Sequence, residues 1–178
     1  MSAQTAIDGP AGLHALVGSP LGSSAWMTIE QPDVDSFAAV TRDEQWIHVD
    51  PERAAAGPFG STIAHGYLTL SLCSHFLEQI FRVDGAAMAV NYGLNRVRFT
   101  APVRAGSRVR ARTTLAAFEP LPNNGAQITT NVVIELEGSE KPACIAETVT
   151  VLDFGARIAH GTPTEIQHDP AVQAARNT

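Results

Sequence analysis

Residues 65–80 read HGYLTLSLCSHFLEQI and form the longest helical pattern in the chain. Apolar residues recur every four positions along one stripe of this pattern: Leu68, Leu72, Phe76 and Ile80. Three further apolar residues widen the stripe: Leu70, Cys73 and Leu77. A helix that is apolar in several directions is covered on more than one side. We therefore predict a buried central helix near Gly66–Arg82.

After Gly85 the apolar pattern changes to a period of two, which is typical of strands. Four strand-like segments follow, at residues 87–99, 107–118, 126–137 and 143–151. Short turns with Gly and Pro join them, which indicates antiparallel pairing. Before the central helix, the sequence predicts a strand at residues 25–30, helices starting at Pro32 and Pro51, and a polar loop at residues 41–50. Helices followed by strands predict an α+β fold.

The length of 178 residues suits one domain with a real core. We expect that domain at residues 25–152, with an N-terminal segment at 1–24 and a loose tail at 153–178 whose removal keeps the fold and most of the activity. The predicted sheet covers one side of the central helix. Because the other side then needs a partner, we expect a homodimer.

Charge and hydropathy argue against several classes of partner. The net charge is −6 and the pI about 5.4, so the chain repels the phosphates of nucleic acids. No apolar stretch is long enough to span a membrane, and residues 1–10 lack the features of a signal peptide. Cys73 and Cys144 lie in apolar patterns typical of buried, reduced thiols. We expect a cytoplasmic protein without a membrane span.

The sequence contains no phosphate-binding loop, dinucleotide-binding fingerprint or nucleophile elbow, and no cluster with metal-site spacing. The remaining possibilities are acid–base catalysis and ligand binding without catalysis. Asp43 and His48 stand five positions apart in the polar loop. A carboxylate there can orient a water and take a proton, and an imidazole can relay one. On spacing alone, capping or surface roles explain such a pair more often.

His65 and Gly66 stand where the central helix begins. The first amides of a helix are unpaired and carry positive partial charge, and Gly allows close approach of a substrate oxygen. This arrangement suits an oxyanion hole for a thioester carbonyl. A plain turn before a core helix explains it equally well without further context.

Several motifs together resemble the MaoC-like dehydratase family of the hotdog fold, which includes R-specific enoyl-CoA hydratases and NodN-like proteins. The resemblance covers roughly residues 20–152 and rests on Asp43, His48, Asp50-Pro51, Gly57–Gly60, Ile63–Gly66 and Asn91–Phe99. It implies an acyl-CoA substrate, an R product, and no cofactor or metal. It also implies a hotdog fold, in which an antiparallel sheet wraps a long central helix.

The resemblance assigns roles by position. Asp43 and His48 match the pair that holds and activates water. The Gly66 amide, next to His65, matches the group that polarises the thioester carbonyl. Ser74 matches a helix serine that hydrogen-bonds the catalytic carboxylate, although it also fits an ordinary small helix residue.

Two departures from the family pattern stand out. Arg42 replaces the Gly that commonly precedes the Asp, and Gln45-Trp46 replaces Asn-Pro. The second change is typical of the NodN-like branch and affects the expected shape of the acyl pocket rather than the Asp/His pair.

Six arginines lie between residues 96 and 112. Arg96 and Arg98 are the candidates for binding the phosphates of coenzyme A. For the others we favour cross-strand pairing with Glu135 and Glu137.

Three functions remain open: an enoyl-CoA hydratase, a hotdog acyl-CoA thioesterase, and a non-catalytic acyl-CoA-binding module. The intact Asp43 and His48 favour the hydratase, because a pure binding module has no use for that pair.

Overall fold

A computed structural model describes residues 4–122 and 124–155 of the chain. Its helices are α1 Gly9–Ala15, α2 Gln31–Thr41, α3 Trp46–Val49, α4 Pro51–Ala55, α5 Gly66–Ser71 and α6 Cys73–Ile80. Its strands are β1 Thr5–Asp8, β2 Pro20–Ser23, β3 Met27–Thr28, β4 Phe81–Asp84, β5 Met88–Phe99, β6 Arg108–Leu121, β7 Gly125–Leu136 and β8 Cys144–Asp153. The predicted tail lies largely outside the described residues.

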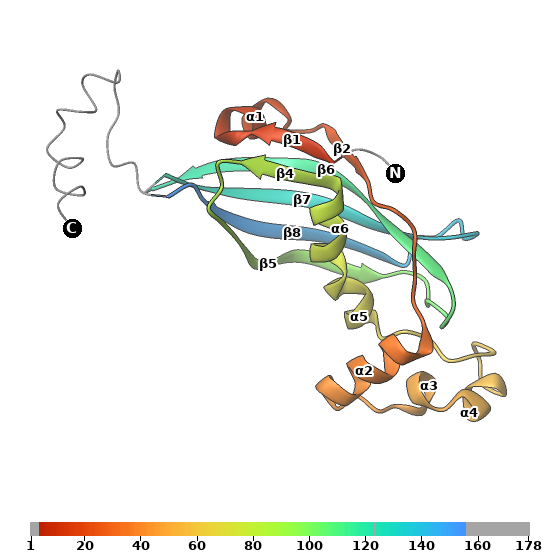
Figure 1. Cartoon of the computed structure of the whole chain (residues 1–178). Coiled ribbons are helices and arrows are strands. Elements are labelled where there is room, and N and C mark those ends of the chain that lie inside the picture. Colours follow the sequence, from red (N-terminus) through yellow and green to blue (C-terminus); the bar gives the residue numbers. More distant parts are fainter. Residues whose placement is uncertain (1–3, 123, 156–178) are drawn as a thin grey trace, which may run out of the picture.

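One antiparallel sheet dominates the fold. Its strand order is β2-β6-β7-β8-β5, and β3 also pairs with β6. Figure 1 shows α5 and α6 crossing one face of this sheet, with α2, α3 and α4 grouped beyond the start of α5. The α+β class and the hotdog arrangement predicted from the sequence are therefore confirmed.

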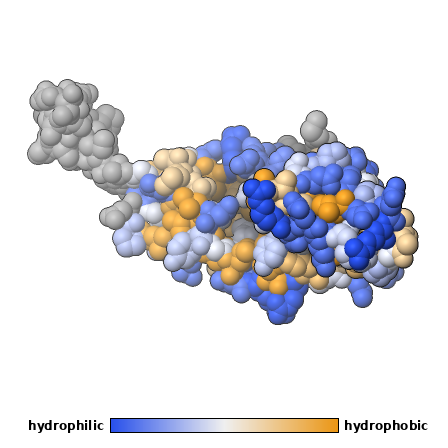
Figure 2. All heavy atoms as spheres, turned by 90° about the horizontal axis from the view of Figure 1, so that it is seen from below, coloured by the Kyte–Doolittle hydropathy of each residue, from blue (hydrophilic) through white to orange (hydrophobic). Residues whose placement is uncertain are grey.

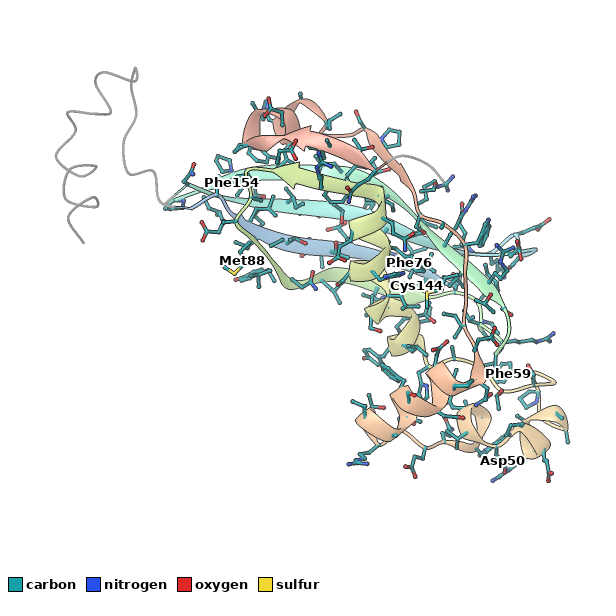
Figure 3. The ribbon with its side chains drawn as sticks, in the orientation of Figure 1. Asp50, Phe59, Phe76, Met88, Cys144 and Phe154 are labelled. Carbon is teal, nitrogen blue, oxygen red and sulfur yellow. The ribbon has the colours of Figure 1, made fainter. Side chains whose placement is uncertain are left out.

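The core forms between the central helix and the sheet. Phe76 of α6 is fully buried there, as are Leu115 of β6 and Ile134 of β7. Figure 3 shows Phe76 beside Cys144 of β8, where helix and sheet meet. Burial of these apolar side chains is the main driving force for the packing.

The described N-terminal residues belong to the same fold. β2 pairs with β6, and β1 pairs in parallel with β4. Ile7 and Leu13 join the core, so residues before position 25 contribute directly to it. The domain boundary at residue 25 stays a prediction.

Two local predictions were wrong. The central helix ends at Ile80 rather than near Arg82, because residues 81–84 pair with residues 5–8 as a strand. The polar loop at residues 41–50 contains the short helix α3. No described helix is long and apolar enough to cross a membrane.

Candidate active site

Asp43 is positioned by the end of helix α2. A capping box between Glu30 and Asp33 starts this helix, and Arg42 ends it in the left-handed conformation, with φ 64°. Residues other than Gly rarely adopt this backbone conformation. The structure thus gives a physical reason for the Gly that the family commonly has at this position. The turn at Arg42 leads the chain directly into Asp43.

His48 lies on α3 and is buried, with 7% of its surface exposed. Its Nδ1 lies 2.7 Å from the carbonyl oxygen of Ile63. Because a carbonyl can only accept, Nδ1 carries the proton, and Nε2 of the neutral ring is free to accept one. Burial lowers the pKa of His48 below its ordinary value of 6.5, and His65 lowers it further. The hydrogen bond to Ile63 and the charge of Asp43 act in the opposite direction.

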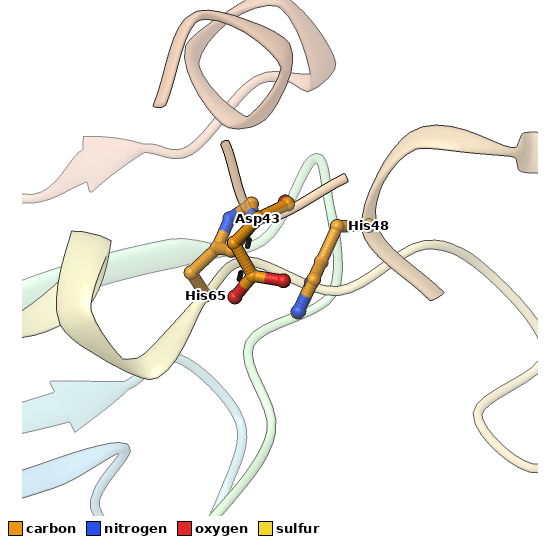
Figure 4. Close-up of side chains that lie close together, drawn as sticks. All are labelled: Asp43, His48 and His65. Carbon is orange, nitrogen blue, oxygen red and sulfur yellow. Dashed lines mark hydrogen bonds and ion pairs between the residues drawn. The ribbon is translucent and has the colours of Figure 1, made fainter. Parts of the chain in front are cut away.

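Three side chains meet here: Asp43, His48 and His65 (Figure 4). The His48 and His65 rings stack with centroids 3.7 Å apart and an interplanar angle of 24°. A carboxylate oxygen of Asp43 lies 4.0 Å from His65 Nε2. The structure therefore brings the predicted Asp/His pair together and adds a second imidazole beneath it.

The ligand atoms of these three residues lie within 4.8 Å of one another, a spacing that also suits a metal ion. However, His48 Nδ1 and His65 Nε2 already face main-chain carbonyls, of Ile63 and Asp43. Among the described residues, only His48 Nε2 and the Asp43 carboxylate remain convergent and without a hydrogen-bond partner, whereas a zinc site uses three or four protein ligands. This bonding favours acid–base chemistry, and the absence of a metal stays a prediction.

A cavity of about 330 Å³ opens beside His48, and Asp43 is not among its lining residues. His48 and Gly66 both line it, together with Phe59, Phe99 and Val103. Gly66 begins α5, and a Cβ at this position would lie 2.9 Å from ring atoms of Phe99. Gly66 therefore allows the Phe99 ring to pack against the main chain at the edge of the cavity.

Ser74 lies away from this group in the single chain. Its hydroxyl accepts a hydrogen bond from Asn91 Nδ2 at 3.0 Å. It borders a second cavity, of about 380 Å³, between α6, β5 and the sheet. Within the described residues of one chain, no hydrogen bond joins Ser74 to Asp43, so its role towards the carboxylate stays a prediction.

Five of the six arginines divide into two groups, and Arg104, whose main chain bridges to Ile63, pairs with neither Glu135 nor Glu137. Arg108 pairs with Glu137, and Arg110 and Arg112 pair with Glu135 across β6 and β7, as the sequence analysis favoured. Arg96 and Arg98 lie exposed on the edge strand β5, and no carboxylate of the described part of the chain lies within 4 Å of either. They stay the candidates for contacts with phosphate.

Both cysteines are free and buried, as predicted. Burial raises the pKa of Cys73 to about 12 and that of Cys144 to about 11. Because the thiolate is the reactive form, neither thiol suits nucleophilic catalysis.

Gln31 also belongs to the site, although the sequence did not indicate it. Its side-chain amide donates to the carbonyl oxygen of His48 at 2.8 Å, and its Oε1 accepts from the hydroxyl of Thr62. Gln31 therefore ties the start of α2 to α3 and to the segment before α5. No local motif signals this role, because the partners lie 17 and 31 residues away along the chain.

Comparison with known proteins agrees with this geometry. The model of the family described as "MaoC like domain" matches residues 13–136. A short second match, to the branched-chain amino acid ATP-binding cassette transporter family, covers residues 156–175, outside the described residues.

Two relatives are similar over most of their length. The chain is 55% identical over 139 residues to a 3-hydroxyacyl-thioester dehydratase Z of Mycobacterium tuberculosis, covering 78% of this chain and 92% of the relative. It is 44% identical over 140 residues to nodulation protein N of Rhizobium leguminosarum bv. viciae, covering 78% and 87%.

The fold is also similar to solved structures. The unliganded R-hydratase of Pseudomonas aeruginosa matches with a TM-score of 0.59 and 26% identity, covering 80% of this chain and 89% of that one. The match of the family model and the identity to full-length relatives agree with the motif around Asp43, His48 and Gly66. The chain therefore belongs to the MaoC-like domain family and is an enzyme of the hydro-lyase class.

Proposed function

We propose that this chain catalyses the reversible hydration of trans-2-enoyl-CoA to (R)-3-hydroxyacyl-CoA. The observation that carries the proposal is the convergence of Asp43 and the unprotonated Nε2 of His48 beside a cavity that Gly66 also lines. The names of the relatives support the reaction class, because they include a 3-hydroxyacyl-thioester dehydratase and an (R)-specific enoyl-CoA hydratase.

In this mechanism Asp43 and His48 both accept hydrogen bonds from one water. The water oxygen bonds to C3 of the enoyl group while Asp43 takes one of its protons. The other proton stays on the new hydroxyl group. Asp43 then passes its proton to C2, so that the sum is addition of one water. His48 holds the water through its free Nε2 and keeps it over one face of the double bond.

As water attacks C3, electron density moves onto the thioester oxygen. The Gly66 amide, first in its helix, is the donor proposed to meet that oxygen. This role is supported by the shared cavity, which Gly66, His48 and Phe99 all line. The coenzyme A group itself belongs to the substrate, and no separate cofactor is needed for these steps.

We also propose that two copies assemble through β5. This strand is an edge of the sheet, with a row of backbone groups that has no neighbouring strand within the described chain. Apolar side chains on it and on β8 are exposed: Met88, Val90, Tyr92, Leu94, Phe99 and Ile145. Figure 2 views the molecule from the side of β5 and shows hydrophobic residues gathered there. Pairing of two β5 strands would bury these side chains and complete both edges.

The function is tested with purified protein and crotonyl-CoA, by following the loss of enoyl absorbance and determining the configuration of the product. We expect hydration to (R)-3-hydroxybutyryl-CoA. Release of free coenzyme A without hydration would instead establish the thioesterase, and binding without turnover would establish the binding module. Sedimentation at micromolar concentration tests the homodimer, and a monomer would contradict it.

A further inference from the structure

His65 is the most deeply buried of the three converging side chains, with 3% of its surface exposed. Its place beside Gly66 in the sequence predicts a group that contacts substrate. In the structure its ring does not line the cavity beside His48 and Gly66. It packs between His48, at a centroid distance of 3.7 Å, and Phe37, at 5.0 Å. A buried ring in this place acts on the catalytic pair rather than on the substrate.

The hydrogen bonds of His65 fix its tautomer. Its Nε2 lies 2.8 Å from the main-chain oxygen of Asp43, and this oxygen can only accept. The proton therefore sits on Nε2. Its Nδ1 is buried and has no partner within the described residues, so a proton there would be an unpaired buried donor. His48 has the opposite tautomer, with its proton on Nδ1.

This bond holds the residue that carries the catalytic carboxylate. The Asp43 side chain is 58% exposed, and within the described residues no hydrogen bond fixes its carboxylate. The main-chain bond from His65 is thus the tether that places Asp43, in a turn that has just left α2 through the left-handed Arg42. His65 is also the N-cap of α5, so the residue that holds Asp43 directly precedes Gly66.

We propose that His65 is a positioning residue that sets Asp43 in register with His48 by donating its Nε2 proton to the Asp43 carbonyl. This role rests on the proposed hydratase function and adds a residue to it. Its effect is on the geometry of the attacking water, so loss of His65 lowers kcat and leaves KM nearly unchanged.

Two variants with side chains of equal length distinguish the effect of the hydrogen bond from the effect of filling the space. His65→Gln retains an amide that can donate to the Asp43 carbonyl, whereas His65→Met fills the same space without a donor. We expect His65→Met to lose about 10- to 100-fold in kcat, the scale of a misplacement of about 1 Å, with KM within about twofold. His65→Gln should stay within about threefold of the wild-type kcat. Phe37→Leu, which changes a packing neighbour of the ring, is the control and should have little effect on kcat.

The assignment is overturned if folded His65→Met hydrates crotonyl-CoA at the wild-type rate, or if His65→Gln falls as far as His65→Met. Should Met at this position prevent folding, a loss in His65→Gln of more than tenfold overturns it alone.

A measurement that does not depend on turnover tests the role of His65 separately from the proposed function. Long-range proton–nitrogen NMR spectra of the wild type should show His65 protonated at Nε2 and His48 at Nδ1. Both variants lose the ring current of the imidazole, and His65→Met, which also lacks a donor to the Asp43 carbonyl, should shift the amide signals of Asp43 and Glu44 further than His65→Gln does. If the wild type fails to hydrate crotonyl-CoA, the proposed function fails while the spectra still decide the role of His65. Opposite tautomers, or amide signals that move no further in His65→Met than in His65→Gln, would overturn that role.

Discussion

The sheet and the helical segment α2–α4 are built in different ways. Strands β6, β7 and β8 pair over 10 to 12 residues, and every second side chain enters a common core. The segment from α2 to α4 consists of an 11-residue helix and two helices of four and five residues. It holds Asp43 and His48 through single hydrogen bonds to Gln31, Ile63 and His65. Apolar burial stabilises the first region, whereas the second uses a few polar contacts to set geometry.

The comparison predicts that stability and the proposed catalysis depend on separate parts of one small domain. A change in the sheet should lower the free energy of unfolding and spare the turnover of the molecules that remain folded. A change in the helical segment should lower turnover and leave the free energy of unfolding nearly unchanged.

The largest effect is expected for the catalytic pair. Asp43→Asn and His48→Gln should each lower kcat by on the order of 10²-fold or more, because each removes a positioned acid or base. Steady-state hydration of crotonyl-CoA measures the loss, and thermal unfolding should change little. Glu44→Gln and His75→Gln, which alter an exposed neighbouring carboxylate and an exposed imidazole on α6, are the matched controls. Wild-type turnover by either folded active-site variant would contradict the mechanism.

The opposite behaviour is expected for Ile134, which is fully buried on β7. Ile134→Ala should lower the free energy of unfolding by about 2–5 kcal/mol through lost burial and a residual cavity. The kcat of the folded fraction should remain close to that of the wild type. Urea unfolding gives the free energy of unfolding, and active-site titration gives the kcat of the folded fraction. A fall in kcat without loss of stability would break the separation between the two regions.

Gln31 should show an intermediate effect. Gln31→Met keeps the length of the side chain and removes both its donor to His48 and its acceptor for Thr62. The net loss of stability should be about 1–3 kcal/mol, since two partly buried partners lose their bonds. The kcat should fall by up to about tenfold, because the main chain at His48 loses a tether. An unchanged kcat in the folded variant would show that Ile63 alone holds His48.

The pH dependence follows from His48. Its pKa is lowered from 6.5, so the neutral form that holds water persists below that pH. The acid limb of kcat/KM should therefore lie below pH 6.5. The unfolded chain takes up the proton nearer pH 6.5, so this residue favours unfolding as the pH falls below that value. A rate profile for the wild type, compared with the unfolding midpoint in the same buffers, measures both. An acid limb above pH 7 would contradict the neutral assignment.

The smallest effect concerns Arg42, which adopts φ 64° at the end of α2. Arg42→Gly should raise the free energy of unfolding by up to about 1 kcal/mol, because Gly takes the left-handed conformation without steric cost. Turnover should change little, since the Arg42 side chain is exposed. Arg42→Ala is the control and should give no gain. A large loss of kcat in Arg42→Gly would instead assign the arginine a role in binding substrate.

Much of this molecule follows from local pattern. The period-two segments gave β5 to β8 to within about three residues, because alternation of burial along a strand is written directly in the sequence. The start of the central helix at Gly66 and the short helix after Pro51 follow from Pro, Gly and capping residues. The convergence of Asp43 and His48 follows from their spacing in a motif that resembles a known family.

Only the tertiary structure decided the end of the central helix and the role of the second imidazole. Residues 81–84 leave the helix because they pair with β1, some 76 positions earlier in the chain. His65 reaches Asp43 across 22 positions, and Gln31 reaches Thr62 across 31. Helix and strand signals repeat over two to four residues, whereas these contacts have no period. They depend on where packing of the core places the ends of α2 and α5, and this is why the sequence indicated the proposed catalytic pair but not the residues that hold it.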